Sequence, residues 1–154
     1  MDSIREKIGQ ALVTRLETIL ISGGYNGDFG LNVNRAKRSY SDDDLPAITL
    51  WMGGESVKSE YGNDKRTLII DVELMDLIGG SETLTNDALA NKIIADAQTC
   101  LGTYDESMMS LIEGFNETNT EPIYPESGSE VISARLTYEI KYLTVKGDPT
   151  LQPQ

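Results

Sequence analysis

The sequence predicts an α+β domain: a mostly antiparallel β-sheet with two α-helices packed on one face. Three segments, at 47–52, 66–77 and 131–144, alternate apolar and polar residues, which is typical of half-buried strands. Two others, at about 4–22 and 85–101, repeat apolar residues every three or four positions, which is typical of helices that face a core. The 154 residues suffice for one hydrophobic core, so we expect a single domain over residues 1–154.

The first helix is expected at about residues 4–22. Ser3 and Glu6 have the spacing of a capping box, in which each side chain satisfies a backbone N–H at the helix start. Gly23-Gly24 can adopt the left-handed conformation that ends helices. The apolar stripe that would face the sheet consists of Ile4, Ile8, Ala11, Leu12, Leu16, Ile19 and Leu20.

The next segments are short strands and turns. A strand is expected from Leu31, and it becomes basic at Arg35, Lys37 and Arg38. Residues 41–44 (SDDD) predict a solvated turn, because they lack the spacing and the closing Glu of a calcium loop. The second strand follows at 47–52. Residues 53–65 hold few apolar side chains and predict a long, mobile loop.

The third strand, at 66–77, carries two carboxylates on its outward side. Asp71 and Glu73 alternate with an inward row of Leu68, Ile70, Val72 and Leu74. Two neighbouring carboxylates can serve acid–base chemistry, because like charges raise the pKa of one of them. A strand surface that faces solvent or another subunit explains them as well, and no third group converges on them in the sequence.

The second helix begins with Thr85 as N-cap and Asp87 in the first turn, and Gly102 takes the C′ position after its end. Cys100 falls on the apolar stripe and is expected to be a small buried side chain. Around this helix we expect a turn at 79–83, a helical turn at 106–109, a short strand at 110–115 and a polar loop at 116–129.

The longest alternating segment is 131–144. Its inward row consists of Ile132, Ala134, Leu136, Tyr138, Ile140 and Tyr142. Its outward row includes Arg135, Glu139 and Lys141. At ~3.3 Å per residue such a strand spans roughly 45 Å, so it is far longer than the usual strand of ~5–6 residues. It must therefore bend at a bulge or extend past its own sheet. The final residues, 147–154, are expected to form a loose tail.

Composition excludes several classes of function. The chain has no histidine, so Ser–His and Cys–His nucleophiles and histidine-bound zinc are impossible. Its single cysteine forms no internal disulfide and fits a reducing cytosol. No segment has the apolar length of a membrane span, and the first ten residues do not predict a signal peptide.

The net charge of −12 comes from one part of the chain. Residues 71–130 hold 13 acidic residues and one basic residue, whereas the remainder holds 12 of each. Binding to nucleic acid or to an anionic membrane surface requires clustered Lys and Arg. The charge therefore argues against both kinds of partner.

In the order and spacing of its elements, the chain resembles the tail-terminator proteins of long-tailed bacteriophages, related to the minor tail protein U of phage lambda. The resemblance covers nearly the whole chain. It includes the N-terminal helix ending near Gly23-Gly24, the strand start Leu45-Pro46-Ala47-Ile48, and the segments 68–74 and 89–101. Its most persuasive part is Ala134-Arg135-Leu136-Thr137-Tyr138-Glu139-Ile140-Lys141-Tyr142 before Gly147-Asp148-Pro149.

This resemblance implies a structural virion protein that is not an enzyme and needs no cofactor. Members of the family form homohexameric rings that cap the tail tube, end its polymerisation and join the tail to the head-side connector. The implied partners are other copies of the chain, the tail tube protein and the connector or completion protein, while DNA passes through the channel without specific binding. The implied location is the head-proximal end of the tail, after assembly in the host cytoplasm.

Two hypotheses about surfaces follow. Rings arise from head-to-tail contacts between unlike surfaces. We expect a basic surface at Arg35, Lys37 and Arg38 to meet acidic residues from 71–130 of the next subunit. The further candidate interface residues are Asp71, Glu73, Arg135, Glu139 and Lys141. In the second hypothesis the surplus acid lines the channel, so that DNA slides without sticking.

Three alternatives stay open at this point. The first is another ring-forming protein of head–tail joining or tail completion. The second is a small cytosolic module with an acidic protein-binding face. The third is a metal-assisted hydrolase that uses Asp71, Glu73 or the Asp42–Asp44 run, because carboxylates alone can hold magnesium or manganese.

Overall fold

The computed structural model describes all residues except 79–83, 103–107, 109 and 127–128. In the described part the helices are α1 (Ile4–Leu16) and α2 (Asn86–Leu101). The strands are β1 (Val33–Arg35), β2 (Ala47–Glu60), β3 (Asn63–Leu77), β4 (Gly114–Ile123) and β5 (Val131–Val145). They form one sheet in the order β1-β2-β3-β5-β4, in which only β1 and β2 pair in parallel. The predicted α+β class is confirmed.

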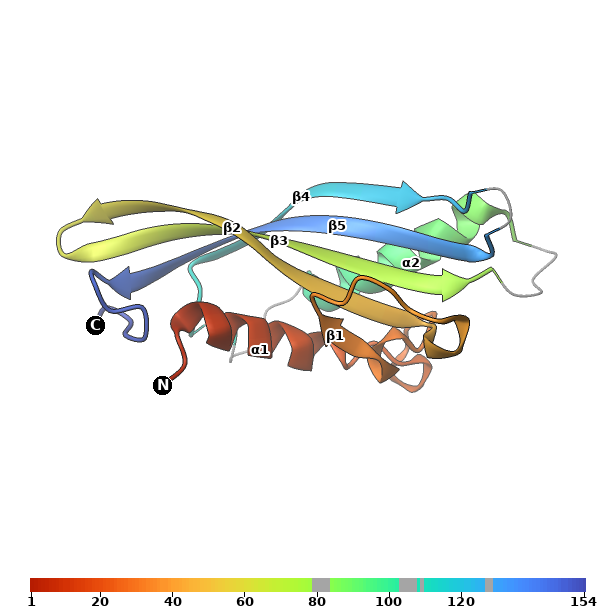
Figure 1. The fold of residues 1–154 in the computed structure, drawn as a ribbon, viewed down its shortest axis with the longest axis horizontal. Coiled ribbons are helices and arrows are strands. Elements are labelled where there is room, and N and C mark those ends of the chain that lie inside the picture. Colours follow the sequence, from red (N-terminus) through yellow and green to blue (C-terminus); the bar gives the residue numbers. More distant parts are fainter. Residues whose placement is uncertain (79–83, 103–107, 109, 127–128) are drawn as a thin grey trace.

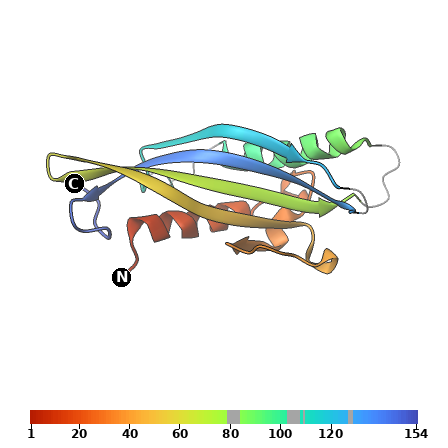
Figure 2. The same cartoon turned by 45° about the horizontal axis from the view of Figure 1, so that its top comes forward.

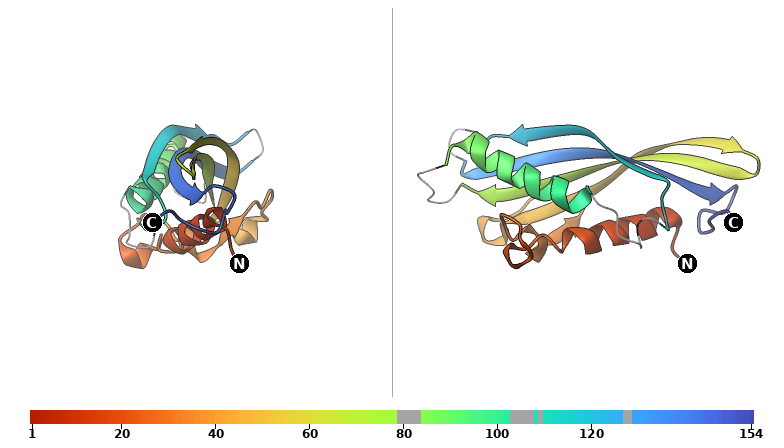
Figure 3. Two further views of the ribbon diagram at one scale, coloured as in Figure 1. Left: turned by 90° about the vertical axis from the view of Figure 1, so that its left-hand side faces the viewer. Right: turned by 180° about the vertical axis from the view of Figure 1, so that it is seen from behind.

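Both helices lie on the same side of the sheet (Figure 3). The α2 helix packs on β4 and β5, and α1 packs beside it against β1 and β2. Every residue of the predicted inward rows of β3 and β5 is buried, and so is Cys100. The helices cover these rows with Ile4, Ile8, Leu12, Leu16, Ala90, Ile93, Ala97 and Leu101. The periodicity of β3 and β5 thus predicted correctly which of their side chains form the core. At the start of β2 it did not, because Ala47, Ile48, Thr49 and Leu50 are all buried.

The α1 helix ends earlier than the stripe predicted. Ser3 accepts a hydrogen bond from the Glu6 N–H at 3.1 Å, but the Glu6 carboxylate binds Arg35 instead of closing a capping box. After Leu16 the chain tightens into i→i+3 hydrogen bonds, and a 3₁₀ turn at Ile21–Gly23 precedes Gly24 at φ 94°. The Gly30 N–H donates to the Ile19 carbonyl at 2.8 Å. This contact from outside the helix holds the chain away from a further helical turn.

Residues 53–65 are not a mobile loop, and this prediction is wrong. They complete a hairpin in which β2 and β3 pair as far as Glu60 and Asn63. Tyr61 and Gly62 form the two-residue turn with φ values of 52° and 80°, as the turn favoured by twisted hairpins requires. We call residues 55–66 the arm. It projects beyond the start of α1 (Figures 1 and 2).

The two predictions around β4 also need correction. The segment expected as a loop from 116 contains most of β4, while 110–113 precede the strand. This strand lies at the edge of the sheet and has exposed polar side chains, so it lacks the alternation of a half-buried strand. Around α2, Thr85 is the N-cap as predicted, but Gly102 is a right-handed C-cap at φ −74°. The turn expected at 79–83 and most of the helical turn expected at 106–109 lie outside the described residues.

Strand β5 is long because it pairs along its whole length with β3, which is equally long. It pairs with β3 without a register shift, from Leu77 opposite Val131 to Asn63 opposite Val145. The bulge lies in its other neighbour, between Glu117 and Asn119 of β4. The end of β5 runs along the β3 half of the arm as far as its turn, where the Lys146 N–H donates to the Gly62 carbonyl at 2.9 Å. A second long strand of the same chain, β3, thus matches the length of β5.

The C-terminal residues are not a loose tail. The Pro149 carbonyl accepts the Ile4 N–H of α1 at 2.8 Å, and the Leu151 carbonyl accepts the Val145 N–H at 2.8 Å. The Gln152 side-chain amide donates to the Ser110 carbonyl at 2.8 Å. The tail therefore joins the start of α1 to the end of β5.

Candidate interaction surfaces

The side of the sheet opposite the helices gathers most of the predicted interface residues. Asp71 and Glu73 from β3 and Arg135, Glu139 and Lys141 from β5 point to this helix-free face. Arg135 donates to Glu73 at 3.1 Å, and the Thr137 hydroxyl donates to Asp71 at 2.6 Å. Each carboxylate thus has its own partner on β5.

The charges on this helix-free face are mostly paired side by side. Glu73 raises the pKa of the Arg135 guanidinium by accepting its hydrogen bond. Lys141 lies 3.7 Å from Glu139 along the same strand. Exposed pairs of this kind contribute only ~0–1 kcal/mol to stability. They therefore contribute little to the stability of the fold.

The predicted basic residues lie at the end of β1 and just after it, at one edge of the sheet. Arg35 binds the Glu6 carboxylate with distances of 2.6 and 3.0 Å, and it lowers the pKa of that carboxyl by this hydrogen bond. The Lys37 ammonium lies 4.6 Å from the centre of the Tyr40 ring, and Arg38 is exposed. Arg35 therefore holds α1 to β1, whereas Lys37 and Arg38 provide positive charge at the surface.

The opposite edge of the sheet is acidic. Strand β4 and the residue before it carry Glu113, Glu117 and Glu121, and Glu117 accepts a hydrogen bond from Gln98 of α2 at 2.9 Å. Four strand spacings separate β1 from β4 in the strand order. At ~4.8 Å per spacing the two edges are roughly 19 Å apart along the sheet. The structure therefore brings the helix-free set together and keeps the basic set separate from the acidic edge.

The Asp42–Asp44 run, which the sequence left open as a possible metal site, forms a turn in the structure. Residues Asp42–Asp44 form a 3₁₀ turn in which Asp44 accepts hydrogen bonds from the backbone and side chain of Ser41. In the described part of the chain, no group of three or more His, Cys, Asp or Glu residues is placed to hold a metal ion. The described helices include none that is long and apolar enough to cross a membrane.

A small cavity lies between α2 and the end of β3. It has a volume of about 80 Å³ and is lined in part by Phe29, Asp76, Lys92 and Asp96. Asp96 is buried and accepts the N–H groups of Asn26 and Gly27 at 2.9 and 3.0 Å, which fixes the loop before Phe29. Burial raises the pKa of Asp76. A cavity of this size is far smaller than the ~300–1,000 Å³ of typical ligand sites.

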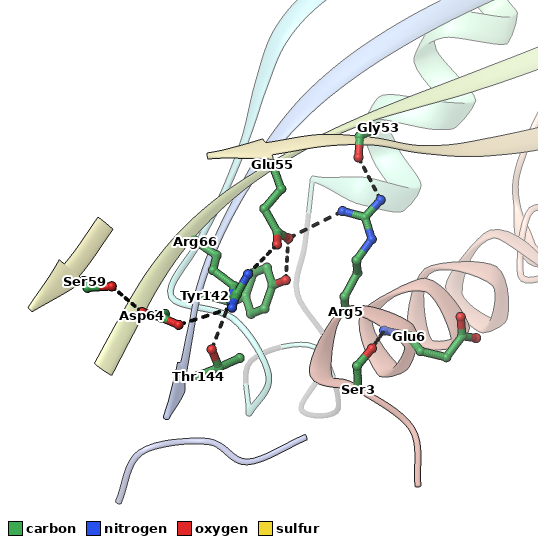
Figure 4. A network of polar contacts seen from close by, with 10 residues as sticks. All are labelled: Ser3, Arg5, Glu6, Gly53, Glu55, Ser59, Asp64, Arg66, Tyr142 and Thr144. Atoms are coloured by element: carbon green, nitrogen blue, oxygen red, sulfur yellow. Dashed lines mark hydrogen bonds and ion pairs between the residues drawn. The ribbon is translucent and has the colours of Figure 1, made fainter. Parts of the chain in front are cut away.

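A polar network at the base of the arm escaped prediction (Figure 4). Glu55 accepts hydrogen bonds from Arg66 at 2.9 Å, from Arg5 at 3.5 Å and from the Tyr142 hydroxyl. Arg66 also binds Thr144 and Asp64. These residues come from α1, β2, β3 and β5, and no local pattern links them. The sequence offered one signal for this network: Arg66 is a charged residue two positions before Leu68, on the side of β3 that was predicted to face inward.

Burial raises the pKa of the Tyr142 hydroxyl, and the hydrogen bond to Glu55 raises it further. The hydroxyl therefore stays protonated and available as a donor at neutral pH. Arg5 also donates to the Met52 and Gly53 carbonyls at 3.2 and 2.7 Å. Through these bonds α1 anchors β2 just before the arm begins.

The chain was compared with models of known protein families and with curated proteins, and neither comparison found a match.

Proposed function

We propose that the protein is a structural subunit that assembles head to tail into a closed ring and acts as a phage tail terminator. The observation that supports this most strongly is the separation of charge between the two edges of one sheet. Lys37 and Arg38 follow the first strand in the order, and Glu113, Glu117 and Glu121 accompany the last.

A ring requires two unlike surfaces on different sides of each subunit. The basic edge and the acidic edge meet this requirement, because one can face the other across a subunit boundary. Opposite charges would set the orientation of the subunits and the rate of encounter more than the total affinity. The homohexamer is the state that the family resemblance implies.

In this proposal the ring caps the tail tube, ends its polymerisation and joins the tail to the head-side connector. The helix-free face suits a channel through which DNA passes. Outside the arm, Asp71, Glu73, Glu121 and Glu139 exceed Arg135 and Lys141 in number on this face, so this part of it would repel phosphates. The tube protein and the connector would bind the two sides of the ring.

The test is a double charge reversal, Lys37→Glu with Arg38→Glu. Arg35 is left unchanged because it holds Glu6, and its reversal would disturb α1. The matched control is Lys7→Glu with Lys146→Glu, which changes the net charge equally at exposed sites on α1 and after β5. Circular dichroism checks that both variants fold.

We expect the natural chain and the control to form rings in electron micrographs and to stop the growth of tail tubes in vitro. We expect the double reversal at the basic edge to remain unassembled at physiological salt. Normal rings from that variant would refute the role of the charged edges. Natural rings that leave tube growth unchanged would refute the terminator function and favour another head–tail joining protein.

A further inference from the structure

The arm exposes a strand edge whose backbone groups have no partner in the described chain. In a two-residue hairpin the residues that flank the turn, Glu60 and Asn63, bond to each other, and the bonding direction then alternates along the strand. The N–H and C=O groups of Val57 and Ser59 therefore point away from β3. Strand β1 pairs with β2 only from Ile48 to Leu50 and leaves this edge open.

The arm keeps this edge in a defined shape. Glu55 and Arg66 are joined at the base of the arm by a 2.9 Å ion pair, with their side chains 13% and 20% exposed. The Ser59 hydroxyl donates to Asp64 at 2.6 Å nearer the tip. The β3 half of the arm also pairs with β5, from Arg66 opposite Tyr142 to Asn63 opposite Val145, so the arm is held as part of a three-stranded sheet with one open edge.

The composition of the arm favours contact with a second copy of the chain. Residues 55–66 contain three acidic and three basic side chains, whereas the whole protein has a net charge of −12. Two copies that approach through their arms therefore meet less repulsion than through most other surfaces. At this edge Val57 is 50% exposed, and Tyr61 at the tip is fully exposed.

The sequence of the edge, ESVKSE at 55–60, fits an antiparallel copy of itself in one register. With Val57 opposite Val57, Glu55 lies opposite Ser59 and Ser56 opposite Lys58, so no like charges face each other. The pairs Val57–Val57 and Glu55–Ser59 then use the backbone groups that point outward, whereas Ser56 and Lys58 face each other without backbone hydrogen bonds. A shift that centres the pairing on Lys58 places two ammonium groups opposite each other, and a shift between these positions places Glu55 opposite Glu60.

We propose that two copies of the protein pair through their arms as antiparallel β2 strands, with Val57 facing Val57 across a two-fold axis. The pairing supplies up to six backbone hydrogen bonds and joins the sheets of the two copies edge to edge through β2, with β3 and β5 of each copy behind it. The contact is small and therefore readily reversible. It uses neither the basic edge nor the acidic edge, so it does not depend on the ring proposed above.

The test uses Val57→Pro in the full chain. Proline removes only the N–H that points outward and is tolerated at an edge, so the bonds between β2 and β3 stay intact. The control is Val57→Thr, which keeps the backbone N–H and the β-branched shape. Analytical ultracentrifugation from micromolar to millimolar concentration measures association, and circular dichroism confirms that both variants fold.

We expect the natural chain and Val57→Thr to form dimers, and Val57→Pro to associate at least about tenfold more weakly because two hydrogen bonds are lost per dimer. Equal association of all three proteins would overturn the proposal.

A second variant, Val57→Cys, tests the register directly. Residues in a bonded antiparallel pair have Cα atoms ~5.5 Å apart, which suits a disulfide. The natural Cys100 is buried and does not compete. We expect an oxidised dimer from Val57→Cys but not from Tyr61→Cys, which this register places opposite Gly53. Equal cross-linking of both variants, or of neither, would refute the register. The double reversal of Lys37 and Arg38 should leave the cross-link intact, which separates this contact from the ring.

Discussion

Arg66 reaches across the base of the arm to Glu55, with 2.9 Å between its Nη1 atom and the Oε2 atom of the carboxylate. Removal of one partner leaves the other charge poorly solvated. We expect Arg66→Ala to lower the free energy of unfolding by about 2 kcal/mol, less than the ~3–5 kcal/mol of a fully buried pair, because both side chains keep some exposure. Urea unfolding measures the loss.

The control for this prediction is Lys58→Ala, which removes the exposed pair between Lys58 and Glu60 at 2.9 Å. Both groups are well exposed to solvent, so we expect this substitution to change stability much less than Arg66→Ala. If the two substitutions destabilise the protein equally, the network around Glu55 has no special role in holding the arm.

Gly53 lies at the bulge opposite Ile69, where a side chain has no room. A Cβ atom there would lie 2.6 Å from the Ile69 carbonyl oxygen, whereas a Cβ atom at Gly54 would meet nothing within 4 Å. We expect Gly53→Ala to destabilise the protein by about 1–3 kcal/mol and Gly54→Ala to change stability by less than ~1 kcal/mol. Thermal unfolding compares the two, and similar melting temperatures would contradict the observed bulge.

The C-terminal tail stabilises the fold by supplying hydrogen-bond acceptors to other elements. Deletion of residues 149–154 leaves the N–H groups of Ile4 and Val145 without the carbonyls of Pro149 and Leu151. We expect a loss of about 1–3 kcal/mol, measured by urea unfolding. Deletion of 153–154 alone keeps these bonds and is the control. Two truncations with unchanged stability would restore the picture of a loose tail.

Asp76 should make stability depend on pH in an unusual direction. Burial raises its pKa, so between the unfolded and folded values the folded state binds more protons than the unfolded state. Its contribution to stability therefore falls as pH rises through that window. We expect Asp76→Asn to raise the melting temperature at neutral pH, and this gain to shrink as the pH falls to about 4.

Asp148→Asn should change the pH dependence of stability in the opposite direction to Asp76→Asn. The hydroxyl and the N–H of Thr150 lower the pKa of Asp148, so its contribution is present above the ordinary carboxyl pKa and is lost as pH falls. This variant should have a lower melting temperature than the natural protein at neutral pH. The difference between the two melting temperatures should become smaller as the pH is lowered. Parallel pH profiles for the two substitutions would contradict the burial of Asp76.

The local predictions succeeded where one face of an element is apolar and the other polar. The inward row of β5 and the buried side of α2 at Cys100 were predicted correctly, since their periods of two and 3.6 residues report which side faces the core. The arm and β4 have no such contrast, because both of their faces meet water or polar groups. Periodicity carries no information about such strands, and both were predicted as loops.

The surfaces were predicted only in part. Asp71, Glu73, Arg135, Glu139 and Lys141 share the helix-free face, as their alternation implied. The sequence could not show that Arg35 is occupied by Glu6, a partner 29 residues away. Nor could it show that Glu55, Arg66 and Tyr142 meet, because their contacts span up to 87 residues.

By itself, the sequence determined the fold class, the two helices, the core rows and the acidic segment, because periodicity and composition are properties of neighbouring residues. The tertiary structure alone decided the strand order and the long hairpin. It also placed the basic and acidic residues at opposite edges of the sheet. These features depend on pairing between distant segments, where backbone hydrogen bonds and the direction of each edge set the geometry. The long strand β5 shows both levels: alternation predicted its faces, and only its pairing with β3 explained its length.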